Sequence, residues 1–156
     1  MAEKTTKPPS KGGAARVPSA AEFRKLAAER EAAKAAEANR EFEVEEERRK
    51  ALIAELSARH VKPEGVENAL RVIRDVAKAG QTEILILHFP NELCSDRGRA
   101  INNSESQWPQ TLTGFPREIF EAWEKHFKDQ GYRLSAKIVD FPGGKPGDVG
   151  LYISWD

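Results

Sequence analysis

Cysteine is nearly absent from this sequence, which holds Cys94 and no other. A single thiol excludes an internal disulfide and a cysteine-rich metal site. Long apolar runs are missing as well: none approaches the length of about 18 to 20 residues that spans a bilayer. The first residues also lack the apolar centre of a signal peptide. We therefore expect a cytoplasmic protein with no membrane segment, no bound metal and no cofactor.

The sequence also lacks an excess of charge of either sign. It has 25 Lys and Arg residues against 25 Asp and Glu residues, and its two halves are each close to neutral. A balanced chain has no long-range field that would attract nucleic acid or an anionic membrane. The exposed face of the predicted sheet offers Tyr152 as its one aromatic, whereas RNA-binding sheets stack bases on two or three. These patterns disfavour a nucleic-acid partner.

Aromatic residues are scarce in the first part of the chain, where only Phe23 and Phe42 precede residue 62. Residues 1–18 combine Pro, Gly and Lys, a composition that cannot bury enough apolar surface to offset its ordering entropy. They are predicted to form a disordered tail. Residues 19–62 contain no Gly or Pro before Pro63 and are rich in Ala, Glu, Lys and Arg. This composition predicts a charged helical arm.

Two local patterns refine the arm. Ser19 and Glu22 have the spacing of a capping box, in which each side chain bonds the backbone amide of the other residue. The arm has no continuous apolar stripe, so its periodicity is too poor for a coiled coil. We expect it to be mostly solvated and to contact the rest of the chain only through Leu52, Ile53 and Leu56. The alternative is a helix that associates with a second copy of itself.

Residues 63–156 predict a small α/β domain with the order helix, strand, helix, strand, strand. The expected elements are an amphipathic helix from Val66 to Ala77, a strand at Thr82–Phe89, a helix at Pro116–Gln130, a strand at Tyr132–Phe141 and a strand from Val149. Two strands joined through a helix should be parallel, with a right-handed crossover, and the last two should form a hairpin. We therefore expect a three-stranded mixed sheet with helices on one face and Thr82–Phe89 at one edge.

The predicted topology places one candidate site. Parallel strands would bring the loops 90–103 and 140–148 together at their C-terminal ends, where α/β folds bind ligands. Arginines and free glycine amides at such a place can hold an anion. The candidate ligand-binding residues are Asp96, Arg97, Arg99, Asn102, Asn103, Asp140, Gly143, Gly144 and Lys145. The alternative is that they form turns and helix caps, for which the same residue types are suited.

No complete catalytic or metal motif is present. Gly143-Gly144-Lys145 is not a phosphate loop, because Pro146 stands where that motif has Ser or Thr. His88, Cys94 and Asp96 are the residue types of a nucleophilic triad, but no neighbouring signature supports one. The histidines stand at no metal-ligand spacing.

Together these observations favour a non-enzymatic protein-interaction or adaptor module. Its protein partner would bind through the helical arm or through the edge of the sheet. An exposed apolar edge strand also favours pairing of two chains into a homodimer. The alternative function is a small-ligand or anion-binding domain, which an enzyme could also use, built on the loops 90–103 and 140–148.

Overall fold

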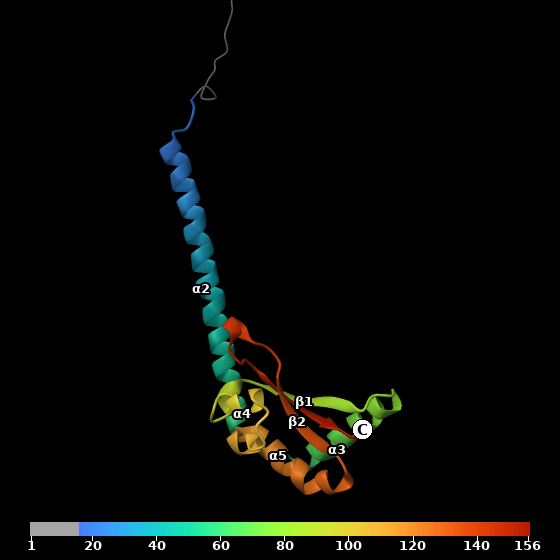
Figure 1. Cartoon of the computed structure of the whole chain (residues 1–156). Coiled ribbons are helices and arrows are strands. Elements are labelled where there is room, and N and C mark those ends of the chain that lie inside the picture. Colours follow the sequence, from blue (N-terminus) through green and yellow to red (C-terminus); the bar gives the residue numbers. More distant parts are fainter. Residues whose placement is uncertain (1–15) are drawn as a thin grey trace, which may run out of the picture. The chain divides into compact units, whose positions relative to one another are not determined.

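The computed structural model describes residues 16–156 (Figure 1). Most of the predicted disordered tail, residues 1–15, lies outside the described residues, and residues 16–19 have no regular secondary structure. The chain divides into two units, residues 1–46 and residues 47–156.

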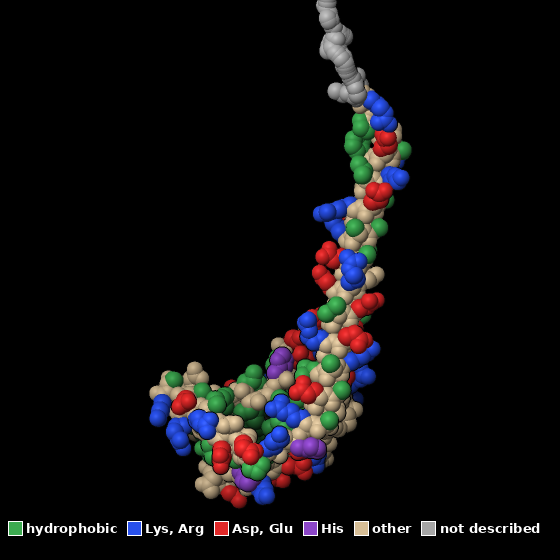
Figure 2. All heavy atoms as spheres, turned by 180° about the vertical axis from the view of Figure 1, so that it is seen from behind, with side chains coloured by type: hydrophobic (Ala, Val, Ile, Leu, Met, Phe, Trp, Pro, Cys, Tyr) green, Lys and Arg blue, Asp and Glu red, His purple; other side chains and the backbone are tan. Residues whose placement is uncertain are grey.

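The long helix α2 (Ala20–Ala58) runs from the first unit into the second. The predicted capping box starts it: the Ser19 amide donates to a Glu22 carboxylate oxygen at 2.7 Å, and the Glu22 amide donates to the Ser19 hydroxyl at 3.2 Å. Every described residue up to Glu46 is exposed, and charged side chains surround this part of the helix (Figure 2). The solvated arm that the composition predicts is therefore present.

The second unit starts earlier than residue 63, where the sequence predicted the domain to begin. It includes the last three turns of α2. Leu56 is only 2% exposed and belongs to the core, Ile53 is half-buried and Leu52 is exposed. Of the three predicted contact residues, Leu56 packs in the core of the domain. Composition could not reveal this boundary, because the helix continues through it without a break.

The second unit is an α/β domain with three strands, as predicted. After α2 its elements are α3 (Pro63–Lys78), β1 (Glu83–Phe89), η1 (Asn91–Leu93), α4 (Arg99–Asn102), η2 (Trp108–Thr111), α5 (Gly114–His126), η3 (Lys128–Gln130), β2 (Arg133–Ile138), η4 (Pro142–Gly144) and β3 (Val149–Ser154). Figure 1 shows α3 and α5 on the same side of the sheet. Helices on one face were expected from the alternation of the strands.

The sheet itself is antiparallel, and the predicted mixed sheet is wrong. The strand order is β1-β3-β2, and β3 pairs antiparallel with both neighbours. The physical reason lies in β3, whose Val149 and Leu151 are fully buried. This most apolar alternation takes the central position and separates β1 from β2. Since β1 and β2 still run in the same direction, β1, α5 and β2 form a split β-α-β unit.

The core consists of two clusters on the helix-covered face. One gathers Leu56, Phe89 and Leu151, and the other gathers Ile73, Phe127 and Ile153. The opposite face is open: there Tyr152 lies over Gly150, and the Lys137 ammonium sits 4.6 Å from the Tyr152 ring centre.

A glycine at the start of α5 allows this helix to lie close to the end of α2. Gly114 has φ +59°, and a Cβ at this position would lie 2.9 Å from the Leu56 carbonyl oxygen. The start of α5 can therefore approach the last turns of α2 only because residue 114 has no side chain.

Candidate functional site

The two loops that the sequence singled out do meet. The Asn91 side-chain amide donates to the Pro146 carbonyl at 2.8 Å, which ties residues 90–103 to residues 140–148. They meet because the second loop leads into β3, whose first residue, Val149, pairs with Phe89 at the end of β1. The predicted convergence of the two loops is confirmed, although the predicted strand order is wrong.

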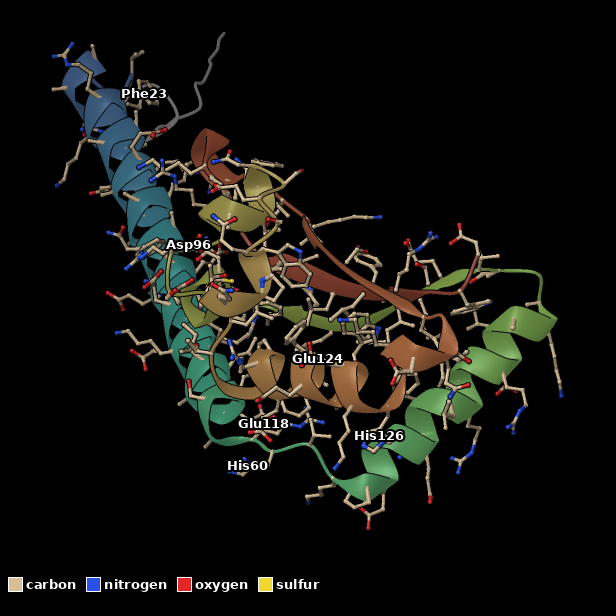
Figure 3. The ribbon with its side chains drawn as sticks, turned by 60° about the horizontal axis from the view of Figure 1, so that its bottom comes forward. Phe23, His60, Asp96, Glu118, Glu124 and His126 are labelled. Atoms are coloured by element: carbon tan, nitrogen blue, oxygen red, sulfur yellow. The ribbon has the colours of Figure 1, made fainter. Side chains whose placement is uncertain are left out.

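The acidic candidates in these loops hold backbone amides. Asp96 accepts hydrogen bonds from the amides of Gly98 at 3.0 Å and Ala100 at 2.8 Å, so it caps the turn that leads into α4 (Figure 3). Asp140 accepts the Asp148 amide at 2.6 Å. A Cβ on Gly147 would lie 2.1 Å from that Asp140 carboxylate, so the hairpin loop closes only around a glycine. Both carboxylates already have structural roles.

The remaining candidates are exposed. They are Arg97, Arg99, Asn102, Asn103, Gly143, Gly144 and Lys145. Arg97 and both glycines have positive φ angles, which marks tight turns. None of these residues lines either of the two hollows described below. Anion binding at the loops stays a prediction.

A salt-bridge cluster ties the two loops to α2, and the sequence did not predict it. Arg49 bonds both carboxylate oxygens of Glu92, at 2.7 and 2.6 Å, and reaches Asp148 at 2.8 Å. His88 Nε2 lies 3.1 Å from the second oxygen of Asp148. Arg49 thereby links the end of α2 to both loops. In the sequence it is one of many cations on a helix, so no local pattern marks it.

The contact between Arg49 and Glu92 favours the charged form of both side chains. The hydrogen bonds that Arg49 donates to Glu92 raise the pKa of Arg49, and they hold the pKa of Glu92 below its ordinary value. The side chains of Arg49, Glu92 and Asp148 each keep between about a quarter and a third of their surface exposed. One guanidinium pairs with two carboxylates from different loops, so the arrangement acts as a clamp between segments.

A larger feature lies under the β1 edge. A hollow of about 820 Å³ opens between α3, β1, α5 and the segment that joins α2 to α3. Its walls are mostly apolar, with Val66, Val72, Ile86, Phe115, Ile119 and Trp123 among them. A second hollow of about 330 Å³, between α3 and the end of β3, includes Leu70 and Trp155. Hydrophobic side chains are visible on the surface of this unit (Figure 2).

Charged groups stand at one rim of the large hollow, on the segment that joins α2 to α3. His60 Nδ1 lies 2.7 Å from one Glu118 oxygen, and the other oxygen accepts the Val61 amide at 3.1 Å (Figure 3). These bonds, the Val61 amide foremost, lower the pKa of Glu118. The Arg59 guanidinium lies over the Phe115 ring, 4.4 Å from its centre. The segment is thus held to α5 at the mouth of the hollow.

The sequence did not predict this hollow. Each of its apolar residues fits a core position in a helix or strand pattern, and periodicity cannot tell a filled core from an open groove. The one available signal was the edge position expected for the first strand, which left apolar side chains to be covered.

His88, Cys94 and Asp96, whose residue types are those of a nucleophilic triad, do not form one in the structure. Cys94 is buried, and burial raises its pKa to about 11, so the thiolate is scarce at neutral pH. Asp96 uses both oxygens to cap backbone amides. His88 contacts Asp148. The three residues therefore belong to three different local arrangements.

Comparisons with known proteins add no function. No family model, curated protein or solved structure matches the chain. Within residues 16–156, no helix has the length and apolar character to cross a membrane. In the same range, no three His, Cys, Asp or Glu side chains are grouped as a metal site would need. The geometry of the hollow remains the basis for a functional argument.

Proposed function

We propose that this chain is a non-enzymatic protein-interaction module that docks an apolar segment of a partner protein in the large hollow. The observation that carries the proposal is the hollow of about 820 Å³ with mostly apolar walls. Val72 lines it and is 45% exposed. Open apolar surface of this kind marks interaction sites on proteins.

The energetics support a bound partner segment. A protein core is normally packed as densely as an organic crystal, and apolar surface left in water forfeits about 25 cal/mol per Å². The two core clusters of this domain are small, and each contributes a residue that lines the hollow. Phe115 comes from the first cluster and Ile153 from the second. A docked apolar segment would join the clusters and add stability to the domain.

The chemistry of the walls favours binding over covalent catalysis. No Ser, Thr or Cys is among the residues that line the hollow. Its histidine, His60, is bonded to Glu118, which also holds the backbone in place. His60 and Glu118 position a chain segment, and no hydroxyl or thiol nucleophile lines the cavity.

A small amphipathic ligand is the second candidate. The volume falls inside the range of about 300–1,000 Å³ that is typical of small-molecule sites, which combine apolar walls with a few polar groups. Arg59 and Lys62 stand at the rim and could receive an acidic head group. The outer edge of β1, which pairs with β3 on its inner side only, lies beside the hollow and gives the peptide proposal its advantage.

The proposal extends to the setting in which the module works. We place the module in the cytoplasm, with residues 20–46 as an arm that offers a partner a second, charged surface. Pairing of two chains at β1 would produce a homodimer. The equal numbers of acidic and basic residues disfavour nucleic acid as the partner.

Selection from a phage-displayed library of random 12-residue peptides tests the proposal on the full chain. Peptides rich in apolar residues should be enriched, and their binding is measured by fluorescence polarisation. Val72→Lys should weaken binding at least about tenfold, because a charge enters the apolar wall. Leu70→Lys is the matched control, since Leu70 lies on the same helix at 39% exposure but outside this hollow.

Three results contradict the proposal or redirect it. No enriched peptide, or peptides that bind Val72→Lys as tightly as the unaltered chain, would refute it. Dodecanoate that displaces a bound apolar dye while no peptide does so would favour the small-ligand candidate.

A further inference from the structure

The outer edge of β1 has no strand beside it. β1 is an outermost strand of the sheet, and its one neighbour in the sheet is β3. Among the described residues, no backbone hydrogen bond joins β1 to a segment other than β3. An uncovered edge of this kind is a ready template for one more strand.

The register identifies the free backbone groups. The Trp155 amide donates to the Thr82 carbonyl at 3.0 Å, which makes the position just before β1 a hydrogen-bonded pair. Bonded and non-bonded pairs alternate in an antiparallel ladder. Ile84 therefore faces β3 with its backbone groups, while the amides and carbonyls of Glu83 and Leu85 point to the open side.

A bulge limits the length of this edge. The pairing of β1 with β3 shifts between Leu85 and Leu87, so Ile86 is an extra residue on the outer strand. Bulges bend the strand that carries them and interrupt further pairing. The regular part of the edge is therefore short, and an added strand needs anchoring beyond its backbone bonds. The hollow supplies this anchoring, since residues 84–87 form one of its walls.

Charge marks one end of the site. Arg59 and Lys62 line the hollow, and no salt bridge joins either of them to a carboxylate within residues 16–156. Glu64 is the one acidic residue among the lining. A partner segment with an acidic residue at this end would therefore gain a charge contact.

We infer that the partner segment binds as an extended fourth strand beside β1, with alternate apolar side chains in the hollow and an acidic residue against Arg59 and Lys62. The inference rests on the proposed function and specifies the form that the partner takes. Backbone bonds to Glu83 and Leu85 supply the register, and the hollow selects apolar side chains. A docked helix would satisfy its backbone internally and leave the edge of β1 unpaired.

Two backbone-methylated versions of a selected peptide test the strand on the full-length protein. One carries N-methyl groups at all odd positions and the other at all even positions. A strand directs alternate amides toward its neighbour, so only one version should lose affinity, on the order of tenfold or more. The other version should bind within a few-fold of the parent peptide.

The outcomes separate this inference from the proposed function. If the peptide depends on Val72 but both methylated versions bind equally well or equally poorly, the segment is not a strand on β1, and only the inference fails. If no peptide is selected, and light scattering shows a dimer that Leu85→Lys converts to a monomer, the edge belongs to a second copy and the inference is overturned.

A charge exchange tests the acidic end. Lys62→Glu should weaken an acidic selected peptide roughly fivefold, in line with an exposed ion pair, and a peptide with Lys in place of its acidic residue should regain that loss. Lys78→Glu is the matched control, because it lies at the far end of α3 and does not line the hollow. Equal effects of the two variants, or no rescue, would remove the acidic residue from the assignment.

Discussion

Phe42 and Phe89 are the same residue type in two regions of one chain with opposite environments. Phe42, in the part of α2 that belongs to residues 1–46, is 65% exposed, whereas Phe89, at the end of β1, is 0% exposed. The first region is helical because Ala, Glu, Lys and Arg favour a helix locally. The second folds because apolar residues distant in sequence pack together. The comparison shows that regular secondary structure and a stable core have separate causes in this molecule.

The largest expected change in the free energy of unfolding comes from shortening the chain at two different points near the boundary between the regions. A chain shortened to residues 47–156 should unfold cooperatively, within about 1 kcal/mol of the full chain, because it keeps all buried residues. A chain shortened to residues 57–156 loses Leu56 and Arg49 and should lose about 4 kcal/mol or more. Urea unfolding followed by tryptophan fluorescence measures both, since all three tryptophans lie in the domain. Equal stability of the two fragments would show that the end of α2 adds nothing to the core.

The second test compares the two phenylalanines directly. Phe89→Ala should lower the free energy of unfolding by about 3–5 kcal/mol, since it leaves a cavity in the core. Phe42→Ala should change it by no more than about 0.5 kcal/mol. Denaturant titration of both full-length variants gives the values. A similar cost for Phe42→Ala would mean that the arm buries this side chain in solution.

The third test concerns Arg49, the residue that ties the end of α2 to both loops. Arg49→Ala should cost about 1–2 kcal/mol, less than a fully buried pair, because water screens part of the cluster. Lys50→Ala is the matched control and should stay within about 0.5 kcal/mol, since Lys50 is 70% exposed. A loss for Lys50→Ala as large as that for Arg49→Ala would show that the clamp has no special role.

The same cluster predicts a pH dependence with a definite sign. The pKa of Glu92 is lowered in the folded state by Arg49. Its contribution is therefore complete above the ordinary carboxyl pKa of about 4.3 and is lost as the pH falls through the lowered folded-state value. Unfolding free energies at pH 7 and pH 3 should differ less in Arg49→Ala than in the unaltered chain. An unchanged difference would mean that other carboxylates cause the acid sensitivity.

The sequence predicted what local patterns control and missed what depends on contacts across the chain. Helix starts, strand periodicity and the meeting of the two loops followed from capping, alternation and chain direction. The place of β3 between the other strands did not, because a hairpin prediction leaves open which side the last strand takes. Arg49 was missed for the same reason: its partners Glu92 and Asp148 are far along the chain. The hollow was missed because an open apolar wall and a closed core have the same sequence pattern.

The smallest expected effect concerns the start of α2, in the exposed region. Ser19→Ala removes the hydroxyl that accepts the Glu22 amide at the start of α2. An N-cap of this kind contributes about 1 kcal/mol to its helix, but the loss should be confined to the first turns, because the arm adds little to the domain's unfolding. Amide hydrogen exchange should therefore rise near residues 20–25, while the urea midpoint of the domain stays the same. Ser57→Ala is the control, since Ser57 is an exposed serine inside the same helix and not at its start. A shift of the urea midpoint on Ser19→Ala would show that the two regions unfold as one, and the distinction between local helix and packed core would fail for this chain.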